Sequence, residues 1–219
     1  MFAESAKRCL VLATVMLSAS VFARAPCTSL PADPGWRSVF SDDILTIFTP
    51  ARASESPQLV ARITWPAKPE HLYKIIWDYA SFREHVPHVR KSEVLLSTGH
   101  RKWIYQQLDL PGPMQDRHYI LESANNDSQP ALQRYRVTWQ LSDRFELPAS
   151  QLVRPAEFSG CWSIQPGSAG GLDALYHIRL DPGGHVPHWM ARAGMRRYAR
   201  ELMKRLHTLL QAPEASNLP

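Results

Sequence analysis

The tetrapeptide His-Val-Pro-His occurs twice in this chain, at residues 85–88 and again at residues 185–188. Imidazole is a common ligand of zinc and other transition metals, so the two pairs could together form a four-histidine metal site. Histidines at positions i and i+3 share one face of a helix, but a proline between them would break the interior of that helix. No carboxylate or cysteine stands at a recognisable metal-ligand spacing. We therefore expect no bound metal. Pro87 is predicted to end one helix, and Pro187 to lie in the first turn of another.

His118, next to Arg117, is the other residue that could do chemistry, as a general base. The sequence contains no nucleophile elbow, no His-Glu-x-x-His motif and no pair of carboxylates at an informative spacing, which does not favour an enzyme. Arg117 shares one face of its predicted strand with Tyr119. If that face is buried, the cation needs an anionic or carbonyl partner, such as a bound anionic group, Asp116 or Asp109. The alternative is an outward, solvated arginine.

The composition predicts one globular domain. The chain has 219 residues, of which 44% are hydrophobic, and this is enough for a sizeable core. The formal net charge is +5, a mild excess that fits anionic partners but is also common in proteins without them. There is no polybasic run of the kind that binds nucleic acid and no glycine-rich phosphate loop. We expect no nucleic-acid partner and no cofactor.

Residues 1–25 are predicted to be a signal peptide. A basic start is followed by an apolar stretch at residues 9–22, which is shorter than the roughly 20 residues that a membrane-spanning helix needs. Small residues at Ala23 and Ala25 place the cleavage near one of these two positions. The alternative is an uncleaved N-terminal anchor. We expect a bacterial exported protein with a periplasmic location.

Export changes what the cysteines can do. Cys9 would leave with the signal peptide, and Cys27 and Cys161 would remain in an oxidising compartment. These two are therefore a candidate disulfide, although sequence alone cannot place them within bonding distance. The alternative, a reactive thiol, lacks a local signature.

Along most of the chain, apolar residues alternate with a period of two, which predicts strands. Residues 26–35 are rich in proline and predict an irregular lead-in. Strands are predicted at residues 42–50, 59–66, 92–98, 102–110, 117–123, 132–141, 158–165 and 174–181. Short connections rich in glycine, proline or asparagine separate the later strands, so these are predicted to form an antiparallel meander.

Two helices are predicted to frame the meander. Pro69 stands at the favoured first position of one of them. The second is long and runs from about Pro187 to Gln211. Its apolar side chains repeat at helical spacing: Met195, Tyr198, Leu202, Leu206 and Leu209. A twisted sheet has one face to cover. The predicted fold class is therefore α+β, with a curved antiparallel sheet wrapped around a long C-terminal helix and room for a cavity between them.

Four stretches, in this order and at this spacing, resemble the START domain, a lipid-binding family. They are Glu70–His85 with Trp77, GPMQDRHYILE (112–122), FSGCWSIQP (158–166) and DPGGHVPHWM (181–190), the last followed by a basic amphipathic helix. The resemblance covers residues 36–210. One departure is His118, which stands where the family usually has aspartate after the arginine. This departure bears on any polar pair built on that aspartate.

The resemblance implies a helix-grip fold around an apolar tunnel. Members of the family mostly bind and move single lipids, and the wider superfamily includes aromatase/cyclases. The domain would span residues 26–212, followed by a loose tail at 213–219. We expect a protein that binds one hydrophobic ligand, a membrane lipid, for periplasmic binding or transfer. The alternatives are an aromatase/cyclase-type enzyme that acts on a polyketide-like substrate in the same cavity, with His118 as its base, and an interaction domain with a filled core.

Side chains on shared faces of the predicted strands and of the last helix are the candidates for ligand binding. Alternation places Tyr135 with Trp139, and Tyr176 with Ile178, on one face of their strands. The candidates are Tyr105, Gln107, Arg117, Tyr119, Tyr135, Trp139, Trp162, Tyr176, Ile178, Met195 and Tyr198. The same side chains could instead fill a closed core, and the cavity is preferred only because of the resemblance.

The last helix also carries a row of basic residues. Arg192, Arg196, Arg200 and Lys204 stand four residues apart beside the apolar stripe. Such a row suits transient docking on an anionic membrane surface. The alternative is an ordinary solvated face whose arginine stems shield apolar surface.

Overall fold

The structure is a computed structural model that describes residues 35–52, 54, 56–110 and 114–212. The predicted signal peptide and the predicted C-terminal tail lie outside the described residues. Over the described part, the domain is built on one nine-stranded sheet in the order β1-β2-β3-β9-β8-β7-β6-β5-β4, and all neighbouring pairs are antiparallel. The strands are β1 (Trp36–Ser41), β2 (Leu45–Pro50), β3 (Gln58–Trp65), β4 (Val89–Thr98), β5 (Arg101–Leu108), β6 (Arg117–Ala124), β7 (Tyr135–Leu141), β8 (Glu157–Pro166) and β9 (Leu172–Asp181).

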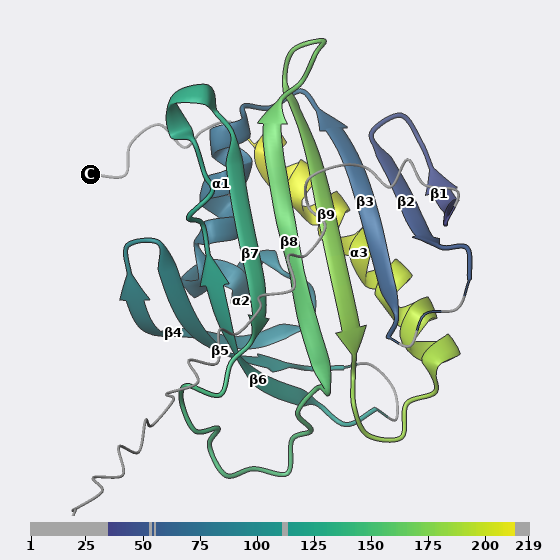
Figure 1. Cartoon of the computed structure of the whole chain (residues 1–219), viewed down its shortest axis with the longest axis vertical. Coiled ribbons are helices and arrows are strands. Elements are labelled where there is room, and N and C mark those ends of the chain that lie inside the picture. Colours follow the sequence, from purple (N-terminus) through teal and green to yellow (C-terminus); the bar gives the residue numbers. More distant parts are fainter. Residues whose placement is uncertain (1–34, 53, 55, 111–113, 213–219) are drawn as a thin grey trace, which may run out of the picture.

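The first three strands form a short meander at one side of the sheet (Figure 1). The carboxylate of Asp42 accepts hydrogen bonds from the backbone N–H groups of Ile44 (3.0 Å) and Leu45 (2.8 Å), which fixes the turn before β2. Leu45 and Ile47 of β2 are then buried at alternate positions. The sequence did not predict β1. Most of its side chains are exposed, so it lacks the alternation of buried residues that marks β2.

Three helical segments carry the chain from β3 to the opposite edge of the sheet. They are α1 (Pro69–Trp77), η1 (Tyr79–Ser81) and α2 (Phe82–His85). Pro69 lies in the first turn of α1 as predicted, and Leu72 and Ile76, one turn apart, are buried. α2 ends at His85, and the next residue, Val86, is extended (φ −105°, ψ 127°) because it precedes Pro87. The predicted role of Pro87 as the end of this helical segment is confirmed.

The remaining strands, β4 to β9, form the predicted antiparallel meander and return toward β3 (Figure 1). β9 pairs with β3 along its length, so that Ala61 lies opposite Tyr176. β7 begins later than predicted, because Pro130–Leu132 form the 3-10 turn η2 in front of it.

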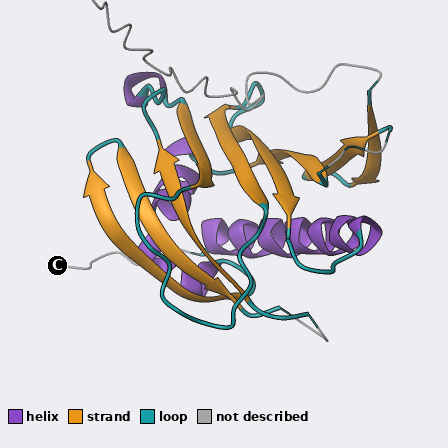
Figure 2. Cartoon of the chain, turned by 60° about the horizontal axis from the view of Figure 1, so that its bottom comes forward, coloured by secondary structure: helices purple, strands orange, loops and turns teal. Residues whose placement is uncertain are grey.

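The last helix, α3 (His188–Gln211), lies along the concave face of the sheet (Figure 2). Pro187 precedes it, and the Pro187 carbonyl accepts hydrogen bonds from the N–H groups of Met190 (3.0 Å) and Ala191 (3.1 Å). The buried side chains of α3 are Met195, Ala199, Leu202, Met203 and Leu206. The predicted fold class, a curved antiparallel sheet with a long C-terminal helix, is confirmed. No helix within the described ranges is both long and apolar enough to cross a membrane.

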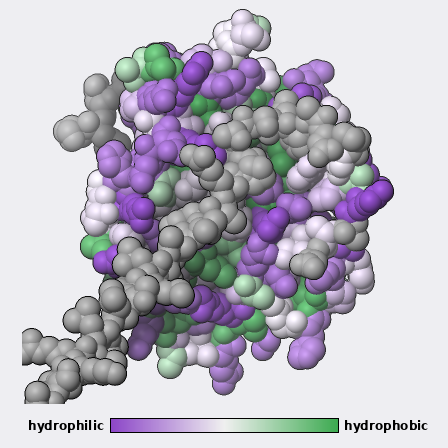
Figure 3. Space-filling model, viewed as in Figure 1, coloured by the Kyte–Doolittle hydropathy of each residue, from purple (hydrophilic) through white to green (hydrophobic). Residues whose placement is uncertain are grey.

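The outer face of the sheet, seen in Figure 3, is largely hydrophilic, with hydrophobic residues between the polar ones. The loop between β7 and β8 covers this face over β5 and β6. The guanidinium of Arg144 lies 4.3 Å from the ring centroid of Trp103, and Oγ of Ser150 lies 3.3 Å from Nε2 of His118. Because of this cover, β5 and β6 bury side chains on both faces.

Candidate ligand-binding site

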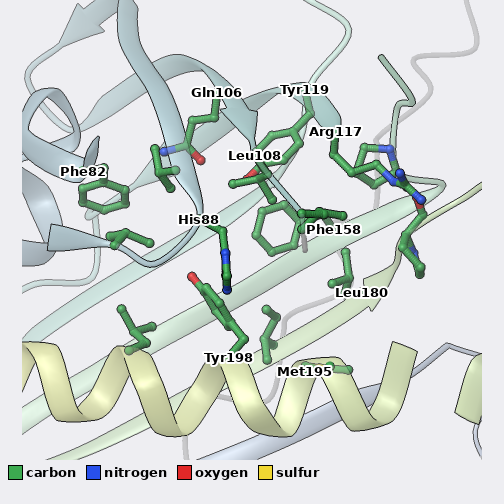
Figure 4. Close-up of a pocket in the computed structure, with 18 of the residues that line it drawn as sticks. Phe82, His88, Gln106, Leu108, Arg117, Tyr119, Phe158, Leu180, Met195 and Tyr198 are labelled. Atoms are coloured by element: carbon green, nitrogen blue, oxygen red, sulfur yellow. The ribbon is translucent and has the colours of Figure 1, made fainter. Parts of the chain in front are cut away.

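A cavity of about 210 Å³ lies between the concave face of the sheet, the helical segments before β4, and α3 (Figure 4). One water molecule needs only about 10–15 Å³ on the same measure. Alternate residues of the strands form its sheet wall: Gln106 and Leu108 of β5, Arg117, Tyr119 and Leu121 of β6, Trp139 of β7, Phe158 and Trp162 of β8, and Tyr176, Ile178 and Leu180 of β9. The wall is therefore mainly apolar, with a few polar groups at fixed places.

Gly160 makes room for one of the wall residues. It stands on the inward face of β8, directly opposite Trp139 in β7. A Cβ at this position would overlap the Trp139 indole and the carbonyl oxygen of His177. Because Gly160 has no side chain, the indole can lie across β8 and stack on Tyr176, with 5.8 Å between ring centroids.

Four tyrosines of the cavity wall bring hydroxyl groups into apolar surroundings. They are Tyr79, Tyr119, Tyr176 and Tyr198. Burial raises the pKa of each of them above the ordinary value, so all four are neutral. The Tyr79 hydroxyl donates to Oγ of Ser123 (2.7 Å), and the hydroxyls of Tyr176 and Tyr198 are hydrogen-bond partners. Such groups can orient a polar atom of a ligand without requiring a charge on it.

Arg117 is buried in the cavity wall with only 3% of its surface exposed. Its guanidinium donates hydrogen bonds to the carbonyls of Pro182 (2.7 Å), Gly183 (3.3 Å) and Gln115. Burial lowers its pKa, and the nearby Asp116 opposes that shift. Arginine nevertheless stays charged in proteins. The partners that this buried cation needs are thus backbone carbonyls, and they tie β6 to the turn before α3.

His88 adds an imidazole to the wall. Its φ is +63°, in the left-handed region that residues with a side chain seldom adopt. Nε2 of His88 lies 3.8 Å from Oε2 of Glu201 in α3, and Figure 4 shows the ring pointing toward Tyr198. The segment between α2 and β4 therefore approaches α3 at this residue.

Most of the candidates predicted from the sequence lie on the cavity wall. They are Arg117, Tyr119, Trp139, Trp162, Tyr176, Ile178, Met195 and Tyr198. Their contact with a ligand stays a prediction.

Tyr105 and Gln107 do not line the cavity, contrary to what we expected of them. They lie on the outer face of β5, whereas Gln106 and Leu108 point inward. Nε2 of Gln107 donates to the Tyr105 hydroxyl (2.7 Å). The sequence left this strand ambiguous because both of its faces are apolar, the outer one beneath the β7–β8 loop.

Tyr135 and His118 also lie away from the cavity wall. The Tyr135 ring faces inward but stacks on Tyr73 of α1, with 4.4 Å between centroids. His118 lies on the outer face of β6, and its Nδ1 is 3.4 Å from both the Tyr105 hydroxyl and Oγ of Ser150. The proposed general base therefore does not line the cavity that it was expected to serve.

Sequence reasoning missed several polar groups of the wall, among them Gln106, His88 and Arg197. Gln106 lies directly opposite Tyr119 in the pairing of β5 with β6, so an inward Tyr119 together with the strand register could have placed it. The sequence does not predict the place of His88, because nothing in it indicates that a histidine takes the left-handed backbone conformation.

The two His-Val-Pro-His motifs have different surroundings. His88 of the first lines the cavity, and both His185 and His188 of the second are exposed near the start of α3. Nowhere in the described ranges do three or more His, Cys, Asp or Glu side chains gather so that they could hold a metal ion. Cys161 is fully buried and disulfide-bonded. Its predicted partner, Cys27, lies outside the described residues, so the pairing stays a prediction.

A curved antiparallel sheet that grips a long helix around an apolar cavity defines the helix-grip class of proteins. Residues 65–207 match the family described as polyketide cyclase / dehydrase and lipid transport, and the chain belongs to this family.

Solved structures with the same fold include both lipid-transfer proteins and enzymes. A STAR-related lipid transfer protein from Xanthomonas axonopodis (fragment 25–204) matches with a TM-score of 0.71 and 20% identity, over 81% of this chain and 99% of that one. Human STARD10 matches with a TM-score of 0.71 and 18% identity, over 81% and 73%. The Zhui aromatase/cyclase from Streptomyces sp. R1128 matches with a TM-score of 0.53 and 11% identity, over 75% and 100%. At these identities the likeness concerns the fold.

An uncharacterised protein of Pseudomonas aeruginosa is 23% identical to this chain over 100 residues. The match covers 45% of this chain and 48% of that protein. The chain thus spans about half the length of this curated relative.

Proposed function

We propose that the protein binds a single hydrophobic molecule, a membrane lipid, in the cavity between the sheet and α3, and carries or holds it in the periplasm. The observation that supports this most is the apolar cavity itself, whose wall is set by strand alternation and by the buried face of α3. The fold and the family support hydrophobic-ligand binding in general. The identity of the ligand as a membrane lipid is our proposal.

Native mass spectrometry of the protein purified from the periplasm without detergent tests the proposal. We expect one lipid per chain, which is released on unfolding and identified after extraction. A matched variant, Ile178→Trp, should fold but carry less lipid, because the larger side chain extends from a fully buried wall position into the cavity. A wild-type protein that stays empty, even after incubation with a total lipid extract, would contradict the proposal.

We further propose that the protein acts by binding and not by catalysis, although the family includes aromatase/cyclases as well as lipid transporters. The only base that the sequence suggested, His118, lies outside the cavity, under the β7–β8 loop. Its pKa is lowered by burial and by Arg154. A His118→Gln variant should bind ligand like the wild type. A cyclisation activity that the wild type shows and this variant lacks, with binding unchanged, would speak for the enzyme alternative.

The periplasmic location is part of the proposal and rests on the N-terminal sequence alone. Fractionation of cells that express the full chain with a C-terminal tag should yield a shortened protein in the periplasmic fraction. Retention of the full-length chain in the membrane fraction would favour the uncleaved anchor instead.

A further inference from the structure

A second cavity, of about 340 Å³, opens at the surface beside the apolar one. We refer to it as the basic cavity. Its lining residues are Arg83 of α2, Arg90 and Val89 of β4, His88 and Asp109. His88 and Val89 also line the apolar cavity, so the two spaces share part of one wall.

Two arginines give the basic cavity its charge. Arg83 and Arg90 are both exposed, and neither guanidinium forms a hydrogen bond or an ion pair with any residue that the structure describes. One exposed carboxylate, that of Asp109, lies with them. Guanidinium groups bind carboxylates and phosphates through paired, charge-assisted hydrogen bonds. The basic cavity therefore offers unused donors to an anion.

The backbone around the basic cavity departs twice from regular geometry. The left-handed conformation of His88 costs about 1–2 kcal/mol for a residue with a side chain. Directly after it, the register of β4 against β5 skips Arg90, which lies in a bulge between Val89 and Lys91. Bulges redirect side chains and are frequent next to binding sites. A hydrogen bond from the Asp109 N–H to the His88 carbonyl (2.8 Å) holds the two sides of the basic cavity together.

Arg117, the buried cation of the apolar cavity, is placed differently, and Arg197, the other arginine of that wall, is exposed on α3. Three backbone carbonyls accept hydrogen bonds from the Arg117 guanidinium, so most of its donor directions are occupied. The guanidinium donors of Arg83 and Arg90 are all unoccupied by the described residues. An anionic group of a ligand would consequently gain more at the basic cavity than at Arg117.

We propose that the basic cavity binds the anionic end, a phosphate or a carboxylate, of an amphipathic ligand whose hydrocarbon chain occupies the apolar cavity. The hydrocarbon chain of the ligand passes beside His88 and Val89, the residues that line both cavities. This inference rests on the proposed function, to which it adds the charge of the ligand and the place of its polar end.

Binding of two matched amphiphiles tests the inference. Dodecyl phosphate and dodecanol share one hydrocarbon chain and differ in charge, and inorganic phosphate supplies the anion alone. We expect the wild type to bind dodecyl phosphate more tightly than dodecanol. The double variant Arg83→Gln/Arg90→Gln should lose about tenfold or more in affinity for dodecyl phosphate and change less than about twofold for dodecanol. The control Arg52→Gln/Arg134→Gln removes two exposed arginines elsewhere and should behave like the wild type.

Each of the following results would overturn the inference. Equal losses for both amphiphiles would mean damage to the fold, and equal losses in the control would mean a general effect of net charge. If Arg117→Gln loses the preference for dodecyl phosphate and the double variant keeps it, the anionic end binds at Arg117 and not in the basic cavity. Inorganic phosphate binding as tightly as dodecyl phosphate would indicate a site for free anions. If the wild type binds dodecanol and dodecyl phosphate equally tightly, the proposed function stands and this inference fails. If neither amphiphile binds the wild type, both fail.

Discussion

Gly160 sets the shape of the cavity wall at the scale of a single residue. Gly160 lies between Phe158 and Trp162 on the inward face of β8. A side chain at position 160 would leave no space for the Trp139 indole beside these two aromatic rings. Because the Trp139 indole occupies the place of the missing Cβ, the wall gains an aromatic surface from the neighbouring strand. The Phe-Ser-Gly-Cys-Trp sequence therefore has a packing reason for its glycine.

Replacement of Gly160 by alanine should lower the free energy of unfolding by about 1–3 kcal/mol, because the added methyl group overlaps both the His177 carbonyl oxygen and the Trp139 indole, which must move apart. Urea denaturation followed by tryptophan fluorescence measures this change. Gly194 of α3 is a suitable control. Apart from its chain neighbours and the backbone of its own helix, no atom of the described residues lies within 4 Å of a Cβ at Gly194. Gly194→Ala should therefore stabilise the helix by up to about 1 kcal/mol. Equal effects of the two substitutions would contradict the packing argument.

His177 predicts a dependence of stability on pH. Burial, and then Arg179, lower its pKa from 6.5 to about 4. Its Nε2 lies 3.3 Å from Oε1 of Gln58, and its buried Nδ1 has no hydrogen-bond partner among the described residues, so the protonated form is poorly accommodated. The unfolded chain binds a proton near pH 6.5 and the folded chain does not. Stability from this residue is therefore complete above pH 6.5 and is lost as the pH falls toward 4, by up to about 3 kcal/mol.

The measurement compares the wild type with His177→Gln by chemical denaturation at several pH values between 4 and 7. We expect the difference in the free energy of unfolding between the two proteins to shift in favour of the variant as the pH falls. A constant difference over this range would show that His177 does not carry the effect.

At the scale of elements, α3 has an apolar face and a basic one. Met195 and Leu202 are buried against the sheet, whereas Arg192 and Arg196 are only half-buried. Trp189, in the first turn of the helix, is 64% exposed, and an exposed indole ring favours the interface between water and membrane. These features fit the expectation from the sequence that α3 docks transiently on an anionic bilayer.

Replacement of Arg192, Arg196 and Arg200 together by glutamine should slow lipid transfer between anionic vesicles and affect neutral ones less, since each charge near the surface contributes roughly 1 kcal/mol. Ligand affinity in solution should not change. Transfer of a fluorescent lipid at low salt is the measurement, and the triple variant Arg37→Gln, Arg52→Gln, Arg134→Gln is the control for net charge. The Arg200 guanidinium lies 5.6 Å from the ring of Phe40, so the alternative is that these stems only shield apolar surface. Equal transfer rates for both variants and the wild type would support that alternative.

Elements differ in how well their sequences predict them. β2 and the last helix each bury one face, so the period of their apolar residues predicts both the element and its inward side chains. β5 buries Trp103 and Tyr105 on one face and Ile104 and Gln106 on the other, so its period does not tell which face is inward. The information that decides this is the loop that covers the outer face, and it is a tertiary contact.

At the scale of the whole molecule, the fold class could be predicted because the spacing of apolar residues in each segment and the short connections between segments leave few possible topologies. The cavity could not, because its volume depends on how the side chains of strands distant in the sequence pack against α3. A pattern of inward Trp162 and Tyr176 fits a filled core and an open cavity equally. The basic cavity was also beyond prediction, since it depends on the left-handed conformation of His88 and on the bulge at Arg90.

The cysteines give a prediction at the same scale. If Cys27 and Cys161 are joined, the mature protein shows no free thiol when it is denatured without reductant. Replacement of Cys161 by serine should then lower the free energy of unfolding by about 2–4 kcal/mol, because the cross-link restricts the unfolded chain. Thiol titration of periplasmic material is the measurement. Cys9→Ser serves as the control and should leave the mature protein unchanged. Detection of two thiols per chain would end the idea of this bond.

The pairing of β3 with β9 has a consequence for how the chain reaches its fold. Gln58 and His177, which meet across these strands, are 119 positions apart in the sequence. Until β9 has left the ribosome or the export channel, the edge of β3 that faces β9 has no partner, and α3, which follows β9, has not yet emerged. The cavity is thus the last part of the domain to form. A topology with such long-range pairing folds slowly, and its nascent intermediates expose both a strand edge and an apolar concave surface, so we expect assembly to depend on chaperones that shield them.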